Sequence, residues 1–121
     1  MGDKRRNYLP KILNAVTTTT VSNRVDVTYA DKVTLLFTTT GGESVFHVQG
    51  SIDAIHYEPA VVMIHNTPNN STQNLQRVVS VDLTSGTELY TLDLHYFGYH
   101  YIQVRADVTS GTAKCDVYIE Y

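Results

Sequence analysis

The chain has 121 residues, one cysteine, nine tyrosines, no tryptophan and a formal net charge of −3 at pH 7. This length fits one domain with one hydrophobic core, and the acidic balance argues against a general nucleic-acid binder. Cys115 has no intrachain disulfide partner, which favours folding in a reducing cytoplasm, and no apolar run is long enough for a transmembrane helix or a signal peptide.

The first predicted element is a short N-terminal arm, residues 1–16, whose composition differs from the rest of the chain. Pro10 limits a helix here to a turn or two, and the Thr17–Thr20 run would continue it poorly. The segment is interpreted as an arm or as a first edge strand, with a disordered basic tail as the default for a terminus. The residues predicted to contact a partner are the basic and apolar ones, Lys4, Arg5, Arg6, Tyr8, Leu9, Ile12 and Leu13.

Residues 17–121 are predicted to form a β domain, because apolar and polar residues alternate with a period of two. A strand buried on both faces is expected at Val61–Ile64, and residues 66–76 form the clearest loop. Turns are predicted at three stretches that contain glycine, which are Thr38–Gly42, Thr84–Thr87 and Thr109–Thr112.

The last of these turns is predicted to close a C-terminal hairpin of residues 102–108 and 113–121. Its core positions are expected to include Val104, Val108, Cys115, Val117 and Ile119. About eight short strands without a long helix predict an all-β fold, a β-sandwich or jelly roll.

Two stretches, Phe46–Asp53 and Tyr99–Tyr121, carry sequence motifs. Both resemble motifs of small bacteriophage virion structural proteins. The first is similar to a strand followed by Gly-Ser-x-Asp-Gly and an aromatic residue, although Ala54 stands where glycine is usual. The other runs from Tyr99-His100-Tyr101-Ile102-Gln103-Val104-Arg105 to Gly111-Thr112-Ala113 and Tyr121. The resemblance implies a virion part such as a capsid decoration or cement protein, a head fibre or a tail accessory.

Catalytic, metal and cofactor sites are not predicted, and the chain is not expected to be an enzyme. His95 and His100 are five residues apart, which on one strand would point them to opposite faces. Cys115 lies within an alternating strand, where a thiol acts as a small hydrophobe. The serines lie in turns without a nucleophile elbow, and the acidic residues are scattered.

Tyrosines concentrate in the last quarter of the chain, most densely around residues 96–101. A partner contact surface and plain cross-strand packing are favoured about equally for this cluster, and a sugar-binding platform is a third interpretation. The aromatic residues predicted to contact a partner are Tyr96, Phe97, Tyr99 and Tyr101.

The leading functional hypothesis is a decoration or cement protein that binds and stabilises the lattice of the major capsid protein. Such a protein is expected in the virion, assembled in the host cytoplasm, as a homo-oligomeric trimer or dimer without nucleic-acid or membrane contact. The alternative hypothesis is a fibre or tail accessory domain that binds host-surface carbohydrate.

Overall fold

The computed structural model describes residues 6–64, 77–92 and 98–121. The predicted all-β class is confirmed, because every regular element of these residues is a strand. The predicted loop at residues 66–76 lies outside them. The strands are β1 (Arg6–Val16), β2 (Thr20–Val21), β3 (Val25–Asp26), β4 (Lys32–Ser51), β5 (Glu58–Pro59), β6 (Val62–Ile64), β7 (Arg77–Val78), β8 (Val81–Leu92) and β9 (Tyr101–Glu120).

All of these strands belong to one antiparallel sheet with the order β1-β9-β4-β8-β6-β7. β2 and β3 also pair with β9, and β5 pairs with β4. The centre of the sheet is the pair β4 and β9, which extends from Lys32↔Glu120 to Ser51↔Tyr101 with register shifts on both sides of Glu43. These two strands of 20 residues each therefore organise the whole chain.

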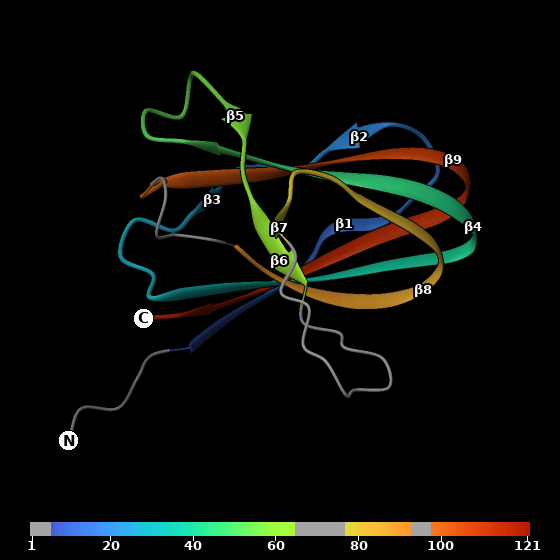
Figure 1. Cartoon of the computed structure of the whole chain (residues 1–121), viewed down its shortest axis with the longest axis horizontal. Coiled ribbons are helices and arrows are strands. Elements are labelled where there is room, and N and C mark those ends of the chain that lie inside the picture. The colour runs from blue at the N-terminus through green and yellow to red at the C-terminus, as the bar shows by residue number, and fades with distance from the viewer. Residues whose placement is uncertain (1–5, 65–76, 93–97) are drawn as a thin grey trace.

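The sheet is folded over on itself, and its three long strands turn a corner at the same end of the molecule (Figure 1). In β4 the buried side chains occupy odd positions up to Thr39 and even positions from Ser44 to Gly50. β8 and β9 change phase in the same way, so both halves of the sheet direct apolar side chains to one interior. Phe37 and Phe46 of β4 stack across this interior with ring centroids 4.5 Å apart.

Close backbone contact holds the corner together. A β-carbon on Gly42 would lie 2.1 Å from the carbonyl oxygen of Ser110, and one on Gly111 would lie 2.3 Å from that of Thr40. Gly111 also has φ +75°, a conformation that suits glycine. Glycine is therefore required at two positions where neighbouring strands bend together.

The three predicted turns are wrong for the same reason, because each lies within a continuous strand. Thr38–Gly42, Thr84–Thr87 and Thr109–Thr112 lie inside β4, β8 and β9, which continue through the corner. The predicted C-terminal hairpin is consequently one bent strand, with β4 rather than its own second half beside it. A corner and a hairpin turn both need glycine and small polar residues, so the local signal is the same.

β1 explains why the N-terminal segment shows near-helical spacing without being a helix. The strand contains register shifts between Leu9 and Leu13 and between Leu13 and Val16, and positive φ angles at Lys11 and Ala15. Each irregularity inserts extra residues relative to β9, so apolar residues four and three positions apart still face the core. The edge-strand interpretation thus describes Arg6–Val16.

The predicted core residues of the last strand are largely where we expected them. Val104, Cys115 and Val117 are fully buried, and Ile119 is 2% exposed. Val108 is half-buried because it adjoins the corner, where the inward-facing phase changes.

Candidate functional site

The apolar residues of the predicted arm pack mainly against their own chain. Leu13 is buried in the core, and Leu9 and Ile12 lie against it. Assigning Leu13 to a partner contact is therefore wrong, because the β1 bulges turn it inward. Tyr8 remains about half exposed. Lys4 and Arg5 lie outside the described residues, and only the backbone of Arg6 is described.

The predicted aromatic surface is not seen as such among the described residues. Tyr96 and Phe97 lie outside them. Tyr101 is half-buried, with the guanidinium carbon of Arg24 5.3 Å from its ring centroid. Tyr99 is buried, so its assignment to a partner contact is wrong. Its interior position follows from its contact with Gly50.

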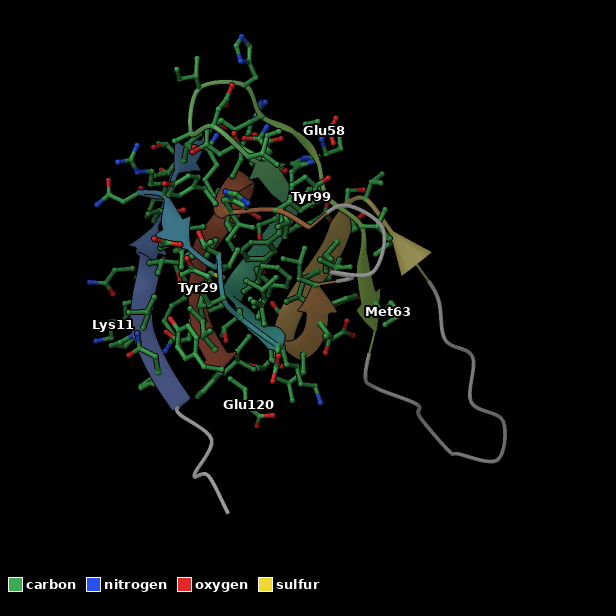
Figure 2. The ribbon with its side chains drawn as sticks, turned by 90° about the vertical axis from the view of Figure 1, so that its left-hand side faces the viewer. Lys11, Tyr29, Glu58, Met63, Tyr99 and Glu120 are labelled. Carbon is green, nitrogen blue, oxygen red and sulfur yellow. The ribbon has the colours of Figure 1, made fainter. Side chains whose placement is uncertain are left out.

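Tyr99 and Gly50 join the two phage-like motifs into one structural unit. A β-carbon on Gly50 would lie 2.5 Å from the Tyr99 ring, so this ring covers a stretch of backbone that only glycine leaves free. The Tyr99 hydroxyl donates to Glu58 Oε1 at 3.2 Å, and Figure 2 shows the two residues close together. Burial and then the Glu58 carboxylate raise the pKa of Tyr99 to about 12.

The loop Ser51–Tyr57, between β4 and β5, is locked by its own side chains. Ser51 Oγ accepts from the backbone N–H groups of Asp53 and Ala54 at 3.2 and 2.9 Å, and donates to Asp53 Oδ1 at 2.9 Å. Asp53 Oδ1 also accepts from the backbone N–H groups of Ile55 and His56, each at 2.9 Å. Its other oxygen lies 2.7 Å from His56 Nδ1. These bonds, led by the His56 side chain, hold the pKa of Asp53 well below its usual range.

This locked loop presents two aliphatic side chains to solvent. Ile52 is 65% exposed and Ile55 is 74% exposed. Ala54 between them has φ +65°, which explains why the motif it resembles usually carries glycine at this position. The loop lies at the end of the molecule opposite the corner (Figure 1). It is an ordered, partly apolar surface suited to contact with another molecule.

A second surface lies on the outer face of the sheet, where β1, β9 and β4 run side by side. The rings of Tyr8 and Tyr118 stack with centroids 4.6 Å apart. They border an open groove of about 420 Å³ that Lys32 and Glu120 also line. Figure 2 shows Lys11 on β1 and Glu120 at the lower end of β9.

His47, Arg105 and Asp107 form a small polar cluster on the surface. His47 Nε2 lies 3.1 Å from Asp107 Oδ2, and Arg105 Nε donates to Asp107 Oδ1 at 2.9 Å. Within residues 6–64, 77–92 and 98–121, no group of three or more His, Cys, Asp or Glu side chains is placed to hold a metal ion. In the same part of the chain, no helix is long and apolar enough to cross a membrane. Burial raises the pKa of the Cys115 thiol far above its usual range.

The fold defines the class of protein. All of the described strands belong to a single antiparallel sheet that is folded over on itself. No family model and no curated protein matches the sequence. Among solved structures, the crystal structure of the SPBc2 prophage-derived protein YomS is similar, with a TM-score of 0.80. The match covers 100% of this chain and 97% of that one at 9% sequence identity. This chain therefore shares its fold with a prophage-derived protein.

The sequence predicts a partner contact for Tyr8 but predicts neither surface as a whole. Ile52 and Ile55 stand in a stretch without periodicity, and only the Ser-x-Asp spacing hinted that the loop would be ordered. Tyr8 and Tyr118 are 110 positions apart in the sequence, so nothing local could pair them.

Proposed function

We propose that this chain is a structural protein of a bacteriophage particle that decorates the assembled head by binding the lattice of the major capsid protein. The observation that carries the proposal is the locked loop with its two exposed isoleucines. Likeness to a prophage-derived protein along the whole chain supports the phage setting. As part of the proposal, the folded sheet is assigned to the β-sandwich class, since its two halves share one core.

The physical basis is low reorganisation on binding. A partner that covers Ile52 and Ile55 gains from removing aliphatic surface from water. Because Ser51 and Asp53 already fix the loop, little conformational entropy is lost when the contact forms. A protein that binds the assembled lattice and not free subunits stabilises the shell by mass action. A trimer or dimer would match the symmetry of lattice junctions.

The test compares complete particles with particles that lack the protein. We expect depleted heads to release DNA at a lower temperature than complete heads. Adding the purified protein should restore the release temperature of complete heads. The variant I52D/I55D should fail to restore it, because two carboxylates would have to be desolvated at the contact. V79D is the matched control, since Val79 is 53% exposed on a different segment.

Two outcomes would contradict the proposal. In one, depleted heads are as heat-resistant as complete ones. In the other, I52D/I55D binds heads as well as V79D does. If depleted particles are stable but fail to attach to cells, the alternative function gains: a fibre or tail accessory that binds host-surface carbohydrate. The groove beside Tyr8 and Tyr118 is the observation that favours this alternative.

A further inference from the structure

Two exposed aromatic rings form a platform on the outer face of the sheet. Tyr8 of β1 and Tyr118 of β9 are direct cross-strand partners, and their ring planes differ by 17°. Tyr8 is 49% exposed and Tyr118 is 42% exposed. Strands rather than loops carry both rings, so the platform has a rigid support.

A buried carboxylate, Asp116, anchors the irregular part of β1 that follows Tyr8. Asp116 is 4% exposed, and one of its oxygens accepts the backbone N–H of Lys11 at 2.6 Å. That N–H is turned toward it where the β1 register shifts and Lys11 takes φ +56°. Partial burial and then the Asp116 charge raise the pKa of Tyr8.

The groove beside the rings is lined by groups that both donate and accept hydrogen bonds. Lys32 and Glu120 are cross-strand partners of opposite charge, and Thr34 is the cross-strand partner of Tyr118. An ammonium donates, a carboxylate accepts and a threonine hydroxyl does both. The groove volume of about 420 Å³ falls within the common range for small-ligand sites, about 300–1,000 Å³.

This combination matches the chemistry of a pyranose. One face of the sugar ring carries C–H groups that pack on an aromatic ring, and its rim carries hydroxyls that need both donors and acceptors. We infer that the groove is a binding site for one or two pyranose rings of a neutral oligosaccharide, held against the exposed side of the stacked Tyr8–Tyr118 pair with Lys32, Thr34 and Glu120 around the rim. The opposite charges of Lys32 and Glu120 favour a neutral sugar over a phosphorylated one. The site goes beyond capsid decoration and is the same whether the protein lies on a head or a tail.

Titration of the intact protein with cellobiose, lactose and chitobiose, followed by amide NMR, tests the inference directly. Binding with a millimolar Kd is expected for at least one of these neutral sugars, since a single shallow site makes few contacts. The shifted amides should be those of Tyr8, Lys32 and Tyr118. No shift with any of the three sugars, or shifts confined to Ser51–Tyr57, would overturn it.

Matched variants separate ring stacking from a general loss of structure. Tyr118→Ala should weaken binding about tenfold or more, whereas Tyr118→Phe should keep most of it because the ring remains. Tyr29→Ala is the control, since Tyr29 is 84% exposed and does not line the groove. If Tyr118→Ala lowers the melting temperature, Lys32→Ala tests the rim instead. The site would be refuted if Tyr118→Ala bound the sugar as tightly as Tyr29→Ala does. Where Tyr118→Ala lowers the melting temperature, the same comparison is made between Lys32→Ala and Tyr29→Ala. The particle experiment above would be unaffected.

Discussion

The two ends of the folded sheet are ordered by different means. At the corner, backbone lies directly on backbone, and a single added β-carbon on Gly42 or Gly111 would meet a main-chain carbonyl. At the opposite end, the loop Ser51–Tyr57 is ordered by the hydrogen bonds of two side chains, Ser51 and Asp53. Order at the corner is therefore part of the fold, whereas order in the loop can be removed while the core stays intact.

The interior that the corner creates should tolerate change least. Val117 is fully buried on β9 between β1 and β4. Val117→Asp should destabilise the protein by about 3 kcal/mol or more, because an unpaired carboxylate would be buried. The measurement is urea denaturation, and labelling of the buried Cys115 thiol provides an independent readout. A variant that unfolds at the wild-type urea concentration would show that this half of β9 does not face the core.

Substitution at the corner should have the next largest effect on stability. Gly111→Ala should cost about 2 kcal/mol or more, because the new methyl group meets the Thr40 carbonyl and φ is positive. Gly86→Ala on β8 is the control, since a β-carbon there has no atom within 4 Å. Similar denaturation midpoints for the two variants would contradict the close approach of β4 and β9.

In the loop, replacement of Ala54 by glycine should stabilise the protein. Ala54 holds φ +65°, so Ala54→Gly should raise the free energy of unfolding by about 0.5–1 kcal/mol as the steric strain is relieved. Ala30→Gly has no such strain to relieve and should lower it. The comparison uses thermal unfolding of both variants. A loss of stability in Ala54→Gly would mean that the loop does not require this conformation.

The smallest effect on global stability is expected from Asp53. Asp53→Ala should leave the melting temperature nearly unchanged, because the side chain is outside the core, while the amides of Ile55 and His56 exchange faster. The folded-state pKa of Asp53 is depressed, so its contribution is present above the unfolded pKa and is lost as the pH falls toward the folded one. Protection of these two amides should therefore persist at pH 4. Loss of protection at pH 4 with the fold intact would refute the lock.

These contrasts also show what the sequence could and could not predict. Alternation in residues 102–108 and 113–119 correctly predicted strands and most of their buried side chains, since a period of two is a local property. The corner was interpreted as turns because Ser110-Gly111 looks the same in either setting, and only its contact with Thr40 and Gly42 distinguishes them. In the candidate site, the composition of residues 1–16 predicts a segment unlike the rest of the chain, but the bulges of β1 and its pairing with β9 depend on residues far along the chain, so the local sequence could not predict them.

β9 has a consequence for how the protein is made. It is the last strand, and β1, β2, β3 and β4 all pair directly with it. During synthesis, β1, β2 and β3 cannot pair with their partner strand until residues 101–120 have left the ribosome. Such non-local pairing is slow to form and exposes unpaired strand edges meanwhile. Pairing of β1, β2 and β3 thus depends on the arrival of β9 rather than on the emergence of these strands themselves.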